Sequence, residues 1–150
     1  GRVDQLEPME RHGEVPLVIP CADRQDELKK IKERINAFLQ GDGVSLGIIL
    51  KTNNAARKLY ELLSPKFDVQ LISPDSTRFI NGISITSIQM SKGLEFDEVL
   101  VPDVSEDTYH TEYDRSLLYI ACTRAMHKLA LLCSGKASPL LPGQRNRQIE

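Results

Sequence analysis

One arginine at the end of an uncharged stretch is the first candidate for chemistry in this chain. Residues 117–122 carry no charge, and Arg124 follows them after a single threonine. A guanidinium beside a buried helix is costly unless an anion lies against it. Two interpretations stay open. Arg124 either pairs inside its own domain or reaches solvent, or it is an arginine finger that contacts the γ-phosphate of a nucleotide held by another domain.

The turn Lys92-Gly93-Leu94-Glu95, which follows a predicted strand, is a second candidate. Gly93 allows a sharp turn or a close approach of the backbone to a ligand. Glu95 can accept hydrogen bonds from a ribose hydroxyl, and Lys92 can hold a phosphate or pair with a carboxylate. Without further context, a Lys-Gly pair is more typical of an ordinary turn with solvated charges.

A third candidate lies where a strand ends and a helix begins, at Lys51-Thr52-Asn53. The N–H groups and the dipole of a helix attract anions at this point. Lysine and asparagine side chains can also contact a nucleic-acid backbone. A helix cap beside a surface lysine explains the local sequence equally well.

Several other kinds of site are not indicated. No Gly-x-x-x-x-Gly-Lys-Ser/Thr phosphate loop occurs, so we expect this chain neither to bind ATP tightly nor to hydrolyse it alone. The acidic residues 103–107 with Tyr109 and His110 are more typical of a solvated loop than of a metal site, and we expect no metal. Three widely spaced cysteines are interpreted as reduced core residues: Cys21, Cys122 and Cys133.

Composition bounds the class of protein. The chain has 150 residues, of which 41% are hydrophobic and 27% charged, as is ordinary for one globular domain. Its net charge of −2 excludes a globally basic nucleic-acid coat but leaves room for a local basic groove. No apolar run approaches the ~20 residues of a membrane span, and the N-terminus has no signal-peptide pattern. We therefore expect a cytoplasmic protein without a membrane partner.

Helical and strand patterns alternate along the chain. Helices are expected from a cap at Asp23 to Gly41, from a cap at Thr52 to Pro65, and over 113–125. Several strands are apolar throughout, which predicts an α/β fold with a mostly parallel sheet and helices on both faces. Strands are expected at residues 15–20, 46–50, 69–72, 83–89, 98–101 and 128–132.

The predicted domain spans residues 15–134, between an irregular segment at 1–14 and a flexible tail at 135–150. Loops at the carboxyl ends of parallel strands commonly form the site in such folds. We expect residues 51–53 and 89–95 to lie at such ends.

Taken together, these segments resemble superfamily 1 helicases of the UvrD/Rep type, specifically their second, RecA-like domain of P-loop NTPase type. Residues 85–101 resemble motif V, and residues 114–131 resemble motif VI with its Thr-Arg-Ala core. Residues 47–63 are similar to the strand and helix of motif IVa. The resemblance covers about residues 45–134.

The resemblance implies roles for individual residues. Arg124 would contact the γ-phosphate and Glu95 the ribose, with Gly93 shaping the loop and Lys92 beside it. For single-stranded DNA, the resemblance implies three further contacts, by Lys51, Asn53 and Gln89. Lysine stands where the family has an arginine, so the planar fork of a guanidinium is missing there. Glutamine stands where the family usually has a histidine.

Two differences from UvrD-type enzymes restrict which branch of the family this chain resembles. Only residues 64–83 separate motifs IVa and V, where UvrD-type enzymes carry a large inserted subdomain. The family's other γ-phosphate arginine, in an Asn-Tyr-Arg-Ser motif, is not in this chain. The compact form looks closest to the HelD and helicase IV branch. The chain also starts without methionine, which we interpret as a fragment.

The resemblance implies the C-terminal domain of an ATP-dependent superfamily 1 DNA helicase or translocase. ATP with Mg²⁺ would sit between this domain and an N-terminal RecA-like domain of the same protein. One alternative is a HelD-like factor that uses ATP to remodel and recycle RNA polymerase. Another is a non-catalytic binding module that kept a degenerate motor fold.

Overall fold

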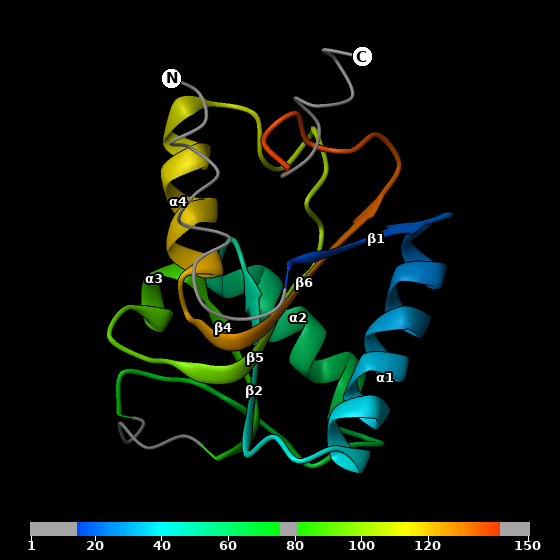
Figure 1. The fold of residues 1–150 in the computed structure, drawn as a ribbon, viewed down its shortest axis with the longest axis vertical. Helices are drawn as coiled ribbons and strands as arrows, with labels where there is room; N and C mark the ends of the chain where they lie inside the picture. Colours follow the sequence, from blue (N-terminus) through cyan, green and yellow to red (C-terminus); the bar gives the residue numbers. More distant parts are fainter. Residues whose placement is uncertain (1–14, 76–80, 142–150) are drawn as a thin grey trace.

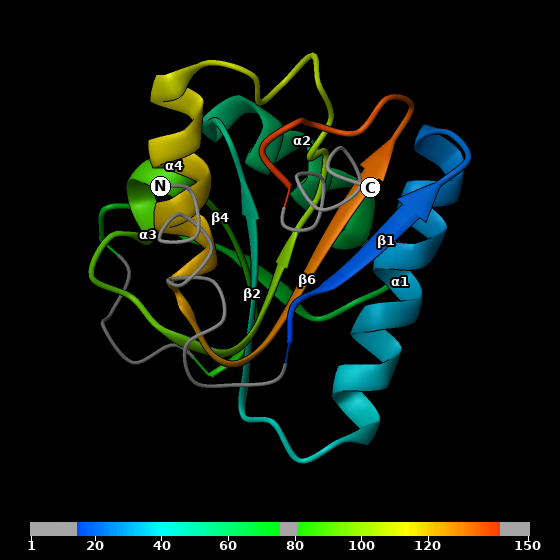
Figure 2. The same cartoon turned by 45° about the horizontal axis from the view of Figure 1, so that its top comes forward.

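The computed structural model describes residues 15–75 and 81–141 of the chain. Within these residues a six-stranded sheet has the order β1-β6-β5-β2-β4-β3, and all its strand pairs are parallel (Figures 1 and 2). The predicted α/β fold is confirmed. The strands are β1 (Leu17–Cys21), β2 (Ser45–Leu50), β3 (Val69–Leu71), β4 (Gly82–Ser87), β5 (Phe96–Val101) and β6 (Ala125–Ser134).

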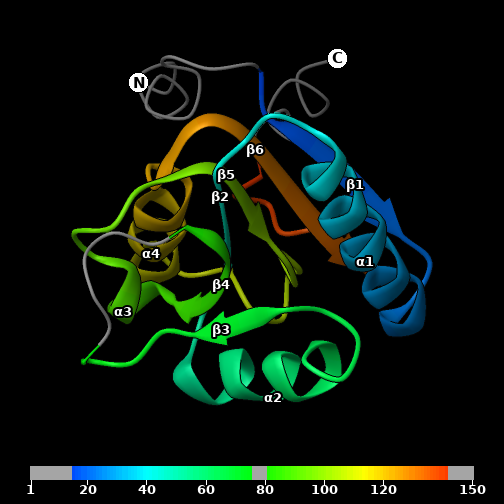
Figure 3. The same cartoon turned by 90° about the horizontal axis from the view of Figure 1, so that it is seen from below.

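Helices cover both faces of this sheet (Figure 3). Helices α1 (Arg24–Gln40) and α2 (Asn53–Leu63) share a hydrophobic core on one face. The short α3 (Ile88–Ser91) and α4 (Glu112–Cys122) share a second core on the other face. The two cores are separated by the sheet itself.

The central strand β2 is largely apolar because both of its faces are buried. In β2, Ile48 and Leu50 point into the core under α1 and α2, whereas Ile49 points into the core under α3 and α4. Every residue of β2 is buried. A continuous apolar run is the pattern expected of a parallel strand covered on both sides.

Polar caps set the starts of the helices at the predicted places. Asp23 accepts a hydrogen bond from the backbone N–H of Asp26 and begins α1. Thr52 accepts from the N–H of Ala55 and begins α2. Side-chain oxygens of this kind satisfy N–H groups that have no partner within the helix.

Several predicted boundaries of helices and strands differ from the structure. Strand β4 ends at Ser87 rather than at Gln89, because the Ser87 hydroxyl caps the short α3. Helix α4 ends at Cys122 and not at residue 125, so Arg124 lies in the turn before β6. Strand β6 is correspondingly longer than the predicted 128–132.

The packed structure continues past residue 134, the predicted end of the domain. Ala137 forms an isolated bridge with Ser105, and the Ser138 hydroxyl donates a 2.6 Å hydrogen bond to the Tyr109 carbonyl. Leu141 is 2% exposed. The predicted irregular segment 1–14 and the tail residues 142–150 lie outside the described residues. No helix among residues 15–75 and 81–141 is long and apolar enough to cross a membrane.

A glycine in β2 makes room for an aromatic ring at the start of β5. A Cβ atom on Gly47 would lie 2.5 Å from Cδ2 of Phe96, whose side chain is completely buried. Phe96 follows Glu95 directly, and its N–H donates a 2.9 Å hydrogen bond to the Arg124 carbonyl. The close approach at Gly47 therefore supports the part of the fold that positions two predicted site residues.

We expect Gly47→Ala to destabilise the domain by about 2 kcal/mol, because the Phe96 ring has no space into which to move. Urea unfolding followed by circular dichroism measures this change. Gly41→Ala is the control, since its Cβ would meet only ordinary contacts at 3.5 Å and beyond. Equal stability of Gly47→Ala and wild type would contradict the packing argument.

Candidate functional site

The guanidinium of Arg124 is held by neutral groups. Its Nη1 donates a 3.2 Å hydrogen bond to the Leu94 carbonyl, and its Nη2 donates a 3.3 Å bond to the Thr123 hydroxyl. No carboxylate in the described parts of the chain forms an ion pair with it. The interpretation of Arg124 as one half of an ion pair within the domain gains no support from these contacts.

One atom of this guanidinium has no partner at all within the described residues. The Nε of Arg124 is buried and makes no hydrogen bond there. Leaving a charged donor buried and unpaired costs free energy. Among residues 15–75 and 81–141, this positive charge is therefore compensated only by neutral oxygens.

The turn formed by residues 92–95 lies directly against Arg124. The carbonyl of Leu94 accepts from the guanidinium, and the N–H of Leu94 donates to the Ser91 carbonyl at 3.0 Å. Gly93 has a φ of +84°, a conformation that favours glycine. Lys92, Gly93 and Glu95 are all exposed. The structure thus brings together all four residues for which a nucleotide role was predicted.

This group lies at the amino ends of the strands, not at the predicted carboxyl ends. Phe96 opens β5 and Ala125 opens β6, and these two residues are register partners on neighbouring parallel strands. The prediction was wrong for residues 92–95 because the connection from β4 returns the chain to the opposite edge before β5 begins. A parallel pair of strands requires such a crossover.

The residues predicted to contact a nucleic acid lie at the other edge of the sheet. Lys51 and Asn53 follow β2, and Gln89 follows β4, which is hydrogen-bonded to β2. Asn53 and Gln89 are exposed. This placement at carboxyl ends agrees with the sequence-based expectation for these three residues.

Lys51, however, is engaged inside the domain. Its Nζ lies 2.8 Å from Oδ1 of Asp114 and 2.6 Å from the Thr108 carbonyl, and 5.6 Å from the centre of the Tyr109 ring. The Lys51 side chain is 27% exposed, against 5% for Asp114. The description of Lys51 as a surface lysine was therefore wrong. Its predicted contact with single-stranded DNA has at most one of its three N–H donors left.

Asp114 is the residue that sequence reasoning did not single out. The Oδ2 atom of Asp114 accepts hydrogen bonds from the backbone N–H groups of His110 and Thr111. In return, the backbone N–H of Asp114 donates a hydrogen bond to the Thr111 hydroxyl. Burial alone raises the pKa of Asp114, but these donors and the Lys51 ammonium outweigh it and hold the pKa well below its ordinary value. The spacing of Thr111 and Asp114 is that of a capping box, a signal visible in the sequence.

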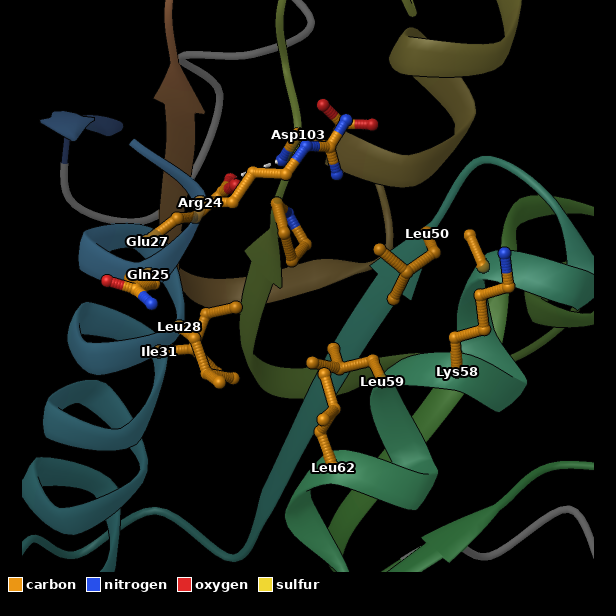
Figure 4. Close-up of a pocket in the computed structure, with 12 residues that line it drawn as sticks. Arg24, Gln25, Glu27, Leu28, Ile31, Leu50, Lys58, Leu59, Leu62 and Asp103 are labelled. Atoms are coloured by element: carbon orange, nitrogen blue, oxygen red, sulfur yellow. Dashed lines mark hydrogen bonds between the residues drawn. The ribbon is translucent and has the colours of Figure 1, made fainter. Parts of the chain in front are cut away.

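A groove that the sequence did not indicate separates α1 from α2. Leu28 and Ile31 of α1 face Leu59 and Leu62 of α2 across it (Figure 4). Its volume is about 370 Å³. Leu50, Pro102 and Asp103, at the carboxyl ends of β2 and β5, also line this groove, which lies on the face of the sheet opposite α3 and α4. Within the described ranges, no cluster of three or more histidine, cysteine, aspartate or glutamate side chains is arranged to hold a metal ion.

Comparison with known proteins bears on the segment that carries Arg124. Residues 82–132 match the family model of the UvrD-like helicase C-terminal domain. The UvrD-like resemblance inferred from motifs V and VI is thereby confirmed over this segment. Its narrower assignment to the HelD branch stays a prediction. No curated protein matches the chain.

Solved structures show similarity over a larger part of the chain. The C-terminal domain of a possible DNA helicase from Lactobacillus plantarum WCFS1 has a TM-score of 0.79 and 29% sequence identity, covering 93% of this chain and 88% of that one. An arterivirus helicase, nonstructural protein 10 in complex with DNA, has a TM-score of 0.52 and 11% identity, covering 82% of this chain and 30% of that one. The second similarity shows the fold alone. The domain is thus similar to helicase C-terminal domains.

We expect Asp114→Asn to lower the free energy of unfolding by about 3 kcal/mol at neutral pH, because it leaves the Lys51 ammonium without its buried counter-charge. The loss should shrink as the pH falls. The folded-state pKa of Asp114 is depressed, so its contribution is fully present above the unfolded pKa of about 3.9 and is lost as the pH drops through the folded pKa.

Urea unfolding at a series of pH values measures this difference. Glu106→Gln is the matched control, since the Lys136–Glu106 pair is more exposed, at 79% and 44%. Removing that pair should cost less than about 1 kcal/mol. A pH-independent effect of Asp114→Asn would contradict the electrostatic explanation.

Proposed function

We propose that this domain is the C-terminal, RecA-like half of an ATP-dependent superfamily 1 DNA helicase or translocase. The match of residues 82–132 to the UvrD-like family supports this proposal. The observation that carries it is the state of Arg124. Its charge meets only a carbonyl and a hydroxyl among the described residues, next to an exposed loop that ends in Glu95.

The residues around Arg124 fit a nucleotide presented by a neighbouring domain. A guanidinium can bind two phosphate oxygens at once and offset the charge that develops during phosphoryl transfer. Glu95 is exposed and can accept hydrogen bonds from a ribose hydroxyl, while Lys92 adds a positive charge to the same loop. We assign the ATP–Mg²⁺ contacts of this half to Arg124, Glu95, Gly93 and Lys92, with the N-terminal RecA-like domain holding the rest.

The edge of the sheet at the carboxyl ends of β2 and β4 is suited to contact single-stranded DNA. Asn53 begins α2 and Gln89 lies on α3, and both side chains are exposed where strands β2 and β4 end. Amide side chains and N–H groups at the start of a helix are common contacts of a phosphate backbone. We assign the contact with single-stranded DNA mainly to Asn53 and Gln89, with Lys51 contributing its remaining donor.

The compact connection between α2 and β4 favours a second candidate, a HelD-like factor that remodels RNA polymerase. Only residues 64–83 lie where UvrD-type enzymes carry an inserted subdomain, and the described part of this segment contains β3 and the first residues of β4. Capture of RNA polymerase by the protein, without strand displacement, would favour this candidate. A protein that neither hydrolyses ATP nor displaces strands would instead be a binding module.

In the protein that joins this domain to its N-terminal RecA-like half, we expect Arg124→Ala to lower ATP turnover on the order of 10³-fold, as loss of an arginine finger does. Steady-state ATPase measurements test this. Arg115→Ala on α4 is the control, because Arg115 is paired with exposed Glu112 at 3.3 Å and should leave turnover unchanged. Unchanged turnover in Arg124→Ala would remove the assignment.

We expect Asn53→Ala and Gln89→Ala each to weaken binding of a thymidine oligonucleotide about fivefold, because each removes about one hydrogen bond to the strand. Fluorescence anisotropy with the labelled oligonucleotide measures the affinity. Gln40→Ala, an exposed amide at the end of α1, should bind as the wild type does. Equal losses in all three variants would argue against a specific strand contact.

A further inference from the structure

The ion pair between Lys51 and Asp114 joins two parts of the domain to which different roles are assigned above. Lys51 lies in the turn between β2 and α2, beside the proposed strand contact Asn53. Asp114 lies in the first turn of α4, and the turn after that helix carries Arg124. Here the inference rests on the proposed function, because it concerns how those two sites are linked.

Helix α4 is well suited to act as a rigid link. It has 11 residues, and so is about 16 Å long. A capping box closes its first turn, and Leu118, Ala121 and Cys122 are buried against the sheet. At its end, Thr123 receives a hydrogen bond from the Arg124 guanidinium. We therefore expect this helix to move as a unit, so that a shift of its first turn would also displace Arg124.

The contacts at the other end are equally restrictive. Both oxygens of Asp114 are occupied, Oδ1 by Lys51 and Oδ2 by two backbone N–H groups. The ammonium of Lys51 is held at the same time by the Thr108 carbonyl. Asp114 is only 4% exposed and the Lys51 side chain 27%, so the pair is partly buried and salt screens it less than a surface pair.

We propose that Lys51 and Asp114 are positioning residues that fix the β2–α2 turn to α4, so that strand contact at one edge of the sheet and the position of Arg124 at the other are coupled. Lys51 acts here through its carboxylate partner, and its charge is not primarily a phosphate contact. The proposed strand contact and the proposed nucleotide contact would both act on the position of one element, helix α4, which has a defined packing on the sheet.

The signal of the Arg124 Nε–H group in nitrogen-15 NMR spectra of the 150-residue chain provides the test. We expect Lys51→Met and Asp114→Asn each to shift this signal, and the double variant to shift it no further than the larger single change. Lys51→Arg, which keeps the charge and the donors, should restore the wild-type position. Asp114→Asn keeps the size of the side chain, so this variant alone provides the test if Lys51→Met does not fold.

Lys30→Met is the matched control. The Lys30 ammonium also contacts a carboxylate and a carbonyl, at 3.1 Å from Asp26 and 2.9 Å from Pro20, but on α1 at the opposite face of the sheet. This variant should leave the Arg124 signal in place. The proposal is overturned if Asp114→Asn folds without moving that signal, or if Lys30→Met moves it equally.

A second arm separates this proposal from the proposed function. A thymidine oligonucleotide added to the wild-type chain should shift the Arg124 signal, and the same saturating addition to Asp114→Asn should shift it less than half as far. Binding with equal shifts in both proteins would overturn the coupling. Absence of binding to wild type would count against the proposed strand contact and against the coupling of strand to Arg124.

Discussion

Each connection in a parallel sheet has to return the chain from the carboxyl end of one strand to the amino end of the next. In this domain that constraint divides the candidate residues between two edges. The turn after β2 and the start of α3 remain at the carboxyl edge, whereas Glu95 and Arg124 come directly before β5 and β6. Helix α4 runs between the edges, and this makes it the natural link between them.

The two cations near α4, Lys51 and Arg124, differ in the partners that surround them. Lys51 is paired with a buried carboxylate and a carbonyl, which is how a domain usually stabilises a partly buried cation. Among the described residues, the guanidinium of Arg124 donates hydrogen bonds only to neutral oxygens, and its Nε has no acceptor. The first charge is used within the fold, and the second is the one that we propose contacts an anion from outside it. The hydrogen-bond partners separate these two cations where exposure does not, since both side chains are partly buried.

Much of the architecture could be predicted from local patterns. Apolar runs such as the one in β2 indicated strands buried on both faces, and the caps at Asp23 and Thr52 marked where helices begin. The errors occurred where two signals compete over a few residues. The Ser87 hydroxyl starts a short helix inside a segment, residues 83–89, that is rich in β-branched residues and therefore looked like continued strand. Thr123 ends α4 before Arg124, although helical residues and the first residues of β6 are similarly apolar.

By itself, the sequence determined which residues have the chemistry for a nucleotide or a strand, because motif spacing and residue type are local properties. Tertiary structure alone decided which of their charges are already in use. The partner of Lys51 lies more than sixty positions away, on a helix brought to β2 by the packing of the sheet, and no local spacing encodes that contact. The same holds for Arg124, whose carbonyl partner on Leu94 is set by the crossover that places β5 beside β6.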